Sequence, residues 1–121
     1  MSPRYRIPPG NTDLDPLLLD PTRLGIVSLL TGAVWCEFAF VRDSVQLTDP
    51  ALSKQVATLS KAGYVEVHKG SVGRAPRTWL RATQRGSARL EQHLSALQAI
   101  VAQARTAAGS HRPEEPPGSL G

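Results

Sequence analysis

The chain has 121 residues, of which 40% are hydrophobic and 20% are charged, which is enough for one small domain with a single core. It contains one cysteine, a count that excludes internal disulfides and fits a cytoplasmic protein. No apolar run approaches the roughly 18 residues of a membrane-spanning helix, and no continuous apolar stretch follows the basic N-terminus. We therefore expect no signal peptide, no membrane segment and a cytoplasmic location.

The two ends of the chain differ in composition from its middle. Residues 1–13 and 107–121 are rich in proline, glycine and serine and poor in large apolar side chains, a composition typical of disorder. The sequence thus predicts a disordered N-terminal arm over 1–13, one folded domain over 14–106 and a disordered tail over 107–121. A folded part of only about 90 residues gains stability by forming a dimer.

The positive charge is concentrated in one block. Residues 48–89 carry eight basic and two acidic side chains, a net charge of +6, whereas residues 1–47 (four basic, five acidic) and 90–121 (two basic, three acidic) each carry −1. A localised basic block is typical of proteins that bind a polyanion. A solvated surface that keeps the protein soluble is the alternative at this point.

Three Asp-Pro pairs predict helix starts, because the aspartate can cap free backbone N–H groups and proline fits the first helical position. The pairs are Asp15-Pro16, Asp20-Pro21 and Asp49-Pro50. They predict a short turn or helix near residue 15 and helices over about 21–31 and 50–62.

Between these helices we expect an extended piece over 33–36, a helix over 37–45 and a turn over 46–48. Gly63 ends the helix of residues 50–62, since glycine accepts the left-handed conformation readily. Apolar residues at helical spacing mark the inward faces. They are Leu24, Val27, Leu30, Phe38, Val41, Val45, Leu52, Val56 and Leu59.

A β-hairpin is predicted next. Residues 64–68 alternate apolar and polar side chains, as in a half-buried strand. Residues 69–76 contain two glycines, a serine and a proline and indicate a loop, and residues 77–81 form the returning strand.

Thr83 can cap a long final helix, which we expect to end near residue 106. Leu90, Leu94, Leu97 and Val101 are spaced by four, three and four residues, the heptad spacing of a helix–helix seam. We interpret this helix, about 83–106, as a dimerisation helix. The alternative is that the seam covers the core of its own domain.

This order of elements predicts a mainly α protein with a small β-hairpin (α+β), namely a winged helix-turn-helix. A helix fits the major groove of B-DNA, and a basic hairpin can reach phosphates or the adjacent minor groove. The candidate contacts from the helix are Thr48, Ala51, Ser53, Lys54, Gln55 and Thr58. Those from the wing, residues 69–77, are Lys69, Ser71, Arg74 and Arg77.

Several motifs resemble those of MarR-type winged-helix regulators. They are Leu47-Thr48-Asp49, Leu52-Ser53-Lys54-Gln55-Val56, Ala62-Gly63-Tyr64-Val65-Glu66-Val67 and, for a compact subgroup, Asp15-Pro16, Pro21-Thr22-Arg23-Leu24-Gly25-Ile26, Glu37-Phe38 and Gly73-Arg74-Ala75-Pro76-Arg77-Thr78. The resemblance implies a bacterial, nucleoid-associated transcriptional regulator that binds palindromic double-stranded DNA as a homodimer. Gln55 departs from the histidine often found there in relatives. The chain also lacks the extra helices in which larger relatives bind small-molecule effectors.

Other functions have weaker support. A winged helix can dock proteins without binding DNA, but such a surface usually presents an apolar anchor. Cys36 could sense peroxide, yet a buried inert thiol is the simpler interpretation. Trp35, Trp79 and Tyr64 could line a ligand cavity, but we expect them to fill the core and anchor the wing. The three histidines do not have metal-ligand spacing and no catalytic motif is present, so we predict no metal, no cofactor and no enzyme activity.

Overall fold

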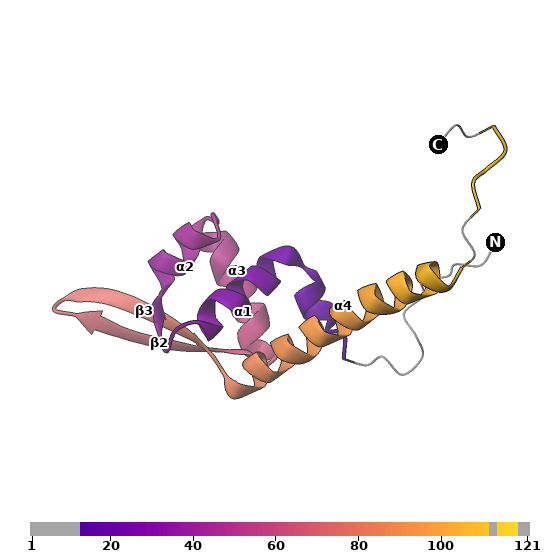
Figure 1. Ribbon diagram of the computed structural model, residues 1–121. Helices are drawn as coiled ribbons and strands as arrows, with labels where there is room; N and C mark the ends of the chain where they lie inside the picture. Colours follow the sequence, from indigo (N-terminus) through magenta and orange to yellow (C-terminus); the bar gives the residue numbers. More distant parts are fainter. Residues whose placement is uncertain (1–12, 112–113, 119–121) are drawn as a thin grey trace.

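The computed structural model describes residues 13–111 and 114–118. It has the predicted order of elements, which confirms the winged helix-turn-helix (Figure 1). The elements are a short 3-10 helix η1 (Pro16–Leu19), α1 (Pro21–Thr31), β1 (Cys36–Glu37), α2 (Phe38–Ser44), α3 (Asp49–Lys61), β2 (Val65–Val72), β3 (Ala75–Ala82) and α4 (Gln84–Ser110). The predictions of disorder for residues 1–12, 112–113 and 119–121 lie outside the described residues.

Two of the three Asp-Pro pairs start helices as predicted. The carboxylate of Asp15 accepts from the N–H of Leu17, and that of Asp20 accepts from the N–H of Arg23. The third pair behaves differently, because Thr48 caps α3 by accepting from the N–H of Ala51 at 3.2 Å. Asp49 is then the first residue of α3. There its negative charge suits the helix N-terminus, and its carboxylate pairs with Arg42 at 2.9 Å.

The turn between α2 and α3 and the end of α3 both use left-handed backbone. Gln46 has φ +58°, and the N–H of Leu47 donates to the carbonyl of Arg42 at 3.0 Å. Gly63 has φ +83°, as predicted from its place after the last helical turn. These two positions set the direction in which the chain enters α3 and the direction in which it leaves α3.

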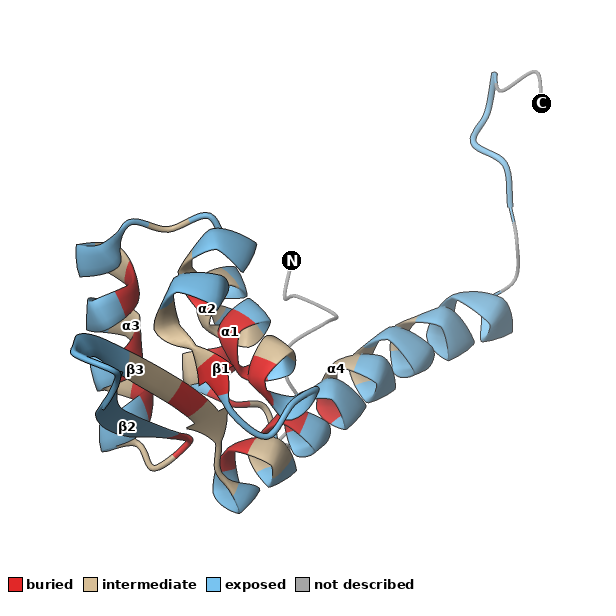
Figure 2. Ribbon diagram, turned by 90° about the vertical axis from the view of Figure 1, so that its left-hand side faces the viewer, coloured by how far each residue is buried: buried red, intermediate tan, exposed pale blue. Residues whose placement is uncertain are grey.

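The core lies where the helices meet the inner face of the sheet and the first turns of α4 (Figure 2). Ile26, which the sequence spacing had not selected, is fully buried, whereas Leu24 is half-buried at the edge. Cys36 is buried, as expected for a structural thiol. The core side chains are Leu18, Ile26, Val27, Leu30, Cys36, Val41, Leu52, Val56, Leu59, Tyr64, Val65, Leu80 and Leu90.

The hairpin is longer than predicted. Residues 69–76 were expected to form a loop, but β2 and β3 pair as far as Val72 with Ala75, so the turn contains only Gly73 and Arg74. Gly73 has φ +61°, which allows this tight turn. Pro76 fits because this end of β3 has one neighbouring strand, since β1 pairs only with Trp79 and Leu80. The result is a two-stranded arm that protrudes from the domain (Figure 1).

The sheet has two unlike faces. Its strand order is β1–β3–β2, and the register puts Cys36, Leu80 and Val67 on the inner face that carries the core. Trp79 and His68 lie opposite one another on the outer face. Tyr64 belongs to the core as predicted, but Trp35 does not, since it is 39% exposed beside the outer face. Trp35 directly precedes β1, at the end of a segment, residues 31–35, that is exposed to solvent.

The long helix α4 continues to Ser110, past the predicted end near 106. Alanines at 107 and 108 favour this extension. Its first turns pack on the domain, whereas its C-terminal half extends away on the side opposite to the hairpin (Figures 1 and 2). Leu90, which the sequence placed in the dimer seam, is 3% exposed and lies in the core of its own domain. No helix among residues 13–111 and 114–118 has the length and apolarity needed to cross a membrane.

A buried polar cluster joins the start of the domain to α4. The backbone N–H of Asp15 donates to Nδ1 of His93 at 2.9 Å, and the Asp15 carboxylate accepts from the Tyr64 hydroxyl and from Arg89. Burial alone raises the pKa of Asp15, but the hydrogen bonds from Tyr64, Leu17 and Arg89 outweigh it and hold this pKa below its usual value. Burial, with the bond to Asp15, raises the pKa of Tyr64.

Candidate nucleic-acid interface

The outward side of α3 is polar and open. Thr48, Ser53 and Lys54 are exposed, whereas Ala51 and Thr58 are half-buried. The Thr58 hydroxyl donates to the carbonyl of Lys54 at 3.2 Å, so it is already engaged with its own helix. Core packing of Leu52, Val56 and Leu59 fixes the rotation of α3 and therefore which side chains point outward.

Gln55 has a different position from the one predicted. It is half-buried, and its Oε1 accepts a hydrogen bond from Nη1 of Arg23 on α1 at 3.2 Å. Arg23 also donates from Nε to the carbonyl of Leu17 at 2.8 Å. Gln55 thus lies at the edge between α3 and α1, and Lys54 is the more exposed neighbour.

Two outward residues of α3 are absent from the DNA contacts predicted from the sequence. Ala57 and Lys61 are exposed, and they follow Lys54 by three and seven residues, which puts all three on one side of the helix. This spacing from Lys54 was the signal that could have found them. Lys54 and Lys61 together give this side of α3 two positive charges.

The wing residues divide between the two faces of the hairpin. The register puts Lys69 opposite Thr78 and Ser71 opposite Pro76, in the same alternation as Val65 and Leu80 on the inner face. The inner face of β2 is the one that packs toward α3. Arg74 lies in the turn at the tip. Lys69, Ser71 and Arg74 are all exposed, and they extend the polar surface of α3 along the hairpin.

Arg77 lies on the outer face instead. It is opposite Gly70, and its Nη1 forms a 2.9 Å salt bridge with Glu37 of β1. The Arg77 guanidinium therefore lies on the opposite face of the hairpin from Lys69 and Ser71, and it is engaged with a carboxylate, unlike that of Arg74 in the turn. In this structure Arg77 fastens the hairpin to β1.

The structure separates the eight basic residues of the block 48–89 into two equal sets. Four are used within the fold, since Arg77 and Arg81 pair with Glu37 and Glu66, Arg85 donates to the carbonyl of Ala62, and Arg89 binds Asp15. The other four are exposed and have no side-chain hydrogen bond or salt bridge to any described residue. These free cations are Lys54, Lys61, Lys69 and Arg74, and all four belong to α3 or the hairpin.

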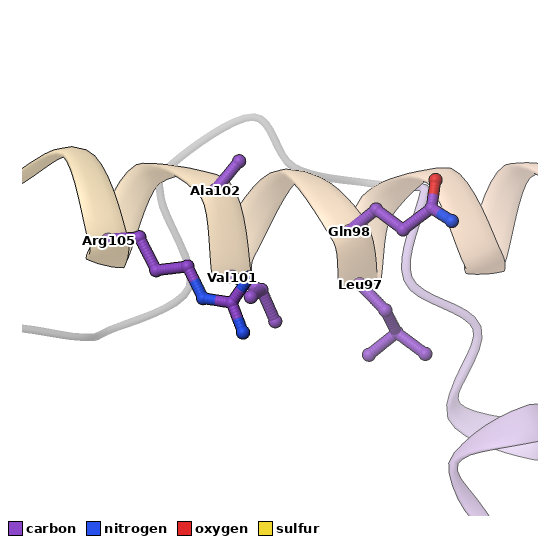
Figure 3. A pocket seen from close by; sticks show the side chains of 5 residues that line it. All are labelled: Leu97, Gln98, Val101, Ala102 and Arg105. Carbon is purple, nitrogen blue, oxygen red and sulfur yellow. The ribbon is translucent and has the colours of Figure 1, made fainter.

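The exposed half of α4 carries a shallow apolar groove with a volume of about 390 Å³. Leu97, Val101 and Arg105 point to one side of the helix (Figure 3). Leu94 and Val101 are 37% and 47% exposed. Three of the four predicted dimerisation residues, all but Leu90, therefore remain at least partly open to a partner.

Metal binding has no structural counterpart in the part of the chain that the structure describes. There, no three histidine, cysteine or acidic side chains come together in a way that could hold a metal ion. His68 and His93 lie in separate surroundings, on the outer face of the sheet and in the buried cluster with Asp15.

Comparison with known proteins matches residues 22–101 to the winged helix DNA-binding domain family. An uncharacterized protein of Methanocaldococcus jannaschii is 28% identical over 72 residues, which are 60% of this chain and 78% of the relative. A transcriptional regulator homologue from Pyrococcus horikoshii OT3 has 28% identity and a TM-score of 0.68, with 73% of this chain and 87% of that chain covered. The M. tuberculosis regulator MOSR, solved in complex with DNA, has 16% identity, a TM-score of 0.59 and coverage of 79% and 68%.

The match spans α1 to the exposed half of α4 and so includes both α3 and the hairpin. The likeness to MOSR, and to the zinc-responsive MarR family member ZitR of Lactococcus lactis at 12% identity, is one of fold. The family consists of DNA-binding domains and not of enzymes, which agrees with the prediction from the sequence that the protein is not an enzyme. The chain belongs to the winged helix DNA-binding domain family and has the fold of MarR-type transcriptional regulators.

Proposed function

We propose that this protein is a transcriptional regulator that binds a palindromic site in double-stranded DNA as a homodimer. On this proposal α3 enters the major groove, the hairpin lies on the backbone or the adjacent minor groove, and the protein acts in the cytoplasm on nucleoid DNA. The observation that carries it is the set of free cations, Lys54, Lys61, Lys69 and Arg74. These four basic residues of the block 48–89 make no side-chain hydrogen bond or salt bridge to described residues. All four lie on α3 or on the hairpin, which are the elements that winged-helix proteins present to DNA.

The roles within this surface follow from position. We expect Ser53, Lys54 and Ala57 on the open side of α3 to contact base edges, where Lys54 can donate to guanine. Lys69, Ser71 and Arg74 carry charge and hydroxyl groups suited to phosphate oxygens. Thr48, Ala51, Gln55 and Thr58 flank these contacts on α3, and Gln55 must release Arg23 before it can reach DNA.

A homodimer fits the exposed apolar face of α4. The described residues of the same domain do not bury Leu94, Leu97 and Val101. Apolar side chains that are exposed to water at this spacing favour packing against a second helix. Two copies related by a twofold axis would present two α3 helices and two hairpins, which is the arrangement that reads a palindrome.

The test begins with selection of bound fragments from random or genomic DNA by the full-length protein. Enrichment of one palindrome is the expected result. On that site, Lys54→Ala should lower affinity more than on scrambled DNA, because a good base contact contributes ~1–3 kcal/mol of discrimination. Equal losses on both DNAs would show that Lys54 touches only the backbone.

Arg74→Ala and Arg77→Ala are a matched pair for the wing. Each phosphate contact contributes about −0.9 to the slope of log K against log salt, so Arg74→Ala in a symmetric dimer should flatten the slope by about two units. Arg77→Ala should leave the slope nearly unchanged, because its guanidinium binds Glu37 on the other face. Failure of any DNA to bind above scrambled competitor would refute the proposed function.

A further inference from the structure

The outer face of the sheet holds an aromatic cup. Trp35, His68 and Trp79 line a depression of about 260 Å³ at the surface. The ring centroids of Trp35 and His68 are 5.9 Å apart, and those of His68 and Trp79 are 5.7 Å apart, with the rings of each pair tilted relative to one another. Gly70 keeps this space open, since a Cβ there would lie 3.2 Å from Trp79.

The cup is separate from the proposed DNA surface. His68 and Trp79 alternate with the inner-face residues Val67 and Leu80, so they point away from the face that packs toward α3. DNA binding therefore gives no reason for two tryptophans to stay at the surface of a domain this small. An exposed aromatic cluster of this kind is typical of a binding site.

The chemistry of the cup favours a proline-rich segment. Its lining is almost wholly aromatic, and proline-rich segments dock on aromatic-lined grooves with little loss of conformational freedom, because proline is already restricted. This chain contains two proline pairs outside the folded domain. Pro8-Pro9 follows the basic residues Arg4 and Arg6, whereas Pro116-Pro117 follows Glu114 and Glu115.

Charge distinguishes the two proline pairs. Two of the three cup residues, His68 and Trp79, lie within the block 48–89, which has a net charge of +6, and the Arg81 guanidinium lies 4.8 Å from the centroid of Trp35 at the rim. Arg81 pairs with Glu66 and Arg77 pairs with Glu37, so these two ion pairs give the rim no net charge of either sign. The surplus positive charge of the block is carried by the exposed residues Lys54, Lys61, Lys69 and Arg74 of α3 and the hairpin. At longer range this charge favours the approach of the acidic proline pair over that of the basic one.

We propose that residues 114–118 of one copy of this chain bind in the aromatic cup of another copy, with Pro116 and Pro117 against the tryptophan rings. The described tail residues are exposed, and they lie at the far end of α4 from the hairpin (Figure 1), so the contact forms between molecules. It goes beyond DNA binding and needs no DNA. It would link copies through a surface different from the α4 groove.

Tryptophan emission reports directly on this contact, because the chain has two tryptophans and both line the cup. The experiment measures emission wavelength and quenching by acrylamide for the full-length protein from low concentration to about 1 mM, a range suited to a short segment that binds weakly. Wild type should show a blue shift and a loss of quenching as concentration rises. The double variant P116A/P117A should show neither, and E114K/E115K should need a higher concentration.

The matched control is the double variant P8A/P9A, which should behave as wild type. Sedimentation of the same samples separates this contact from the α4 dimer, since P116A/P117A should keep the dimer and lose only larger assemblies. Three outcomes would overturn the proposal: constant quenching in wild type, equal concentration dependence in P116A/P117A, or loss of the effect in P8A/P9A. None of these readouts involves DNA, so they do not depend on whether the proposed regulator function holds.

Discussion

The two halves of α4 share an apolar stripe at helical spacing but have opposite surroundings. Over residues 84–96, Gly86, Leu90, His93 and Ala96 are buried against the domain, whereas over 97–110 no described residue is fully buried. Both halves are rich in good helix formers and carry apolar residues at three- and four-residue spacing. Periodicity therefore shows that a helix has an apolar stripe, but not whether its own domain or a second molecule covers that stripe.

The largest contrast should come from placing a charge in each half. Leu90→Glu puts a carboxylate into the core without a partner, which should abolish cooperative unfolding because total stability is only about 5–15 kcal/mol. Val101→Glu lies where the side chain is 47% exposed, so it should leave each domain folded and convert the dimer to a monomer.

Circular dichroism during urea unfolding and sedimentation velocity measure the two outcomes. Loss of the fold in Val101→Glu would show that the C-terminal half of α4 is needed by its own domain. A wild-type protein that sediments as a monomer at tens of micromolar would remove the dimer from the proposed function.

Glycine-to-alanine changes give a smaller but closely matched contrast. A Cβ at Gly86 would lie 2.3 Å from the carbonyl oxygen of Tyr64, whereas nothing lies within 4 Å of one at Gly109. Gly86→Ala should therefore destabilise the protein by about 1–3 kcal/mol or more through overpacking. Gly109→Ala should raise stability by up to about 0.5–1 kcal/mol, since alanine favours a helix. Equal melting temperatures for the two variants would contradict the close contact between α4 and Tyr64.

The buried cluster around Asp15 makes the stability of the contact between η1 and the first half of α4 depend on pH. The pKa of Asp15 is lowered in the folded protein, so its contribution to stability is present above its unfolded pKa of about 3.9 and is lost as pH falls through the folded value. Asp15→Asn should lower stability near pH 7 by about 1–3 kcal/mol and flatten the acid limb of the stability curve. Urea midpoints measured from pH 2 to 7 check this, and an unchanged acid limb would show that Asp15 is not coupled to folding.

The smallest effect is expected at the helix caps. Thr83 accepts from the N–H of Gly86 at 3.0 Å and donates to the carbonyl of Gly63 at 2.6 Å. Thr83→Ala should lose about 1 kcal/mol, whereas Thr83→Ser keeps both bonds and should lose much less. At the other end Ser110 is exposed, so Ser110→Ala should stay within about ±0.5 kcal/mol. Similar losses for Thr83→Ala and Ser110→Ala in thermal unfolding would contradict the difference between the two halves.

The features that could be predicted from sequence are local ones. The caps at Asp15, Asp20 and Thr83 and the helix end at Gly63 each depend on residues within one turn of helix. For the same reason the winged helix order was predictable, since each element has its own period and boundary residues.

The features that sequence reasoning missed depend on distant partners. Arg77 binds Glu37, 40 residues away, and Gln55 binds Arg23, 32 residues away. Nothing in the local pattern distinguishes these side chains from free ones such as Arg74 and Lys54. The hairpin was underestimated for a similar reason, because pairing of Val72 with Ala75 overrides the low strand propensity of the glycines and proline around it.

The bond between Asp15 and His93 has a consequence for the order of folding. It joins residues 78 positions apart, and closing so long a loop is unfavourable until other contacts shorten it. Tyr64, midway along the chain, binds the same aspartate and divides that loop into two shorter ones. We therefore expect β2 to dock before η1 is locked, with η1 joining late. The first residues of the domain would then be the last to become protected from hydrogen exchange during refolding.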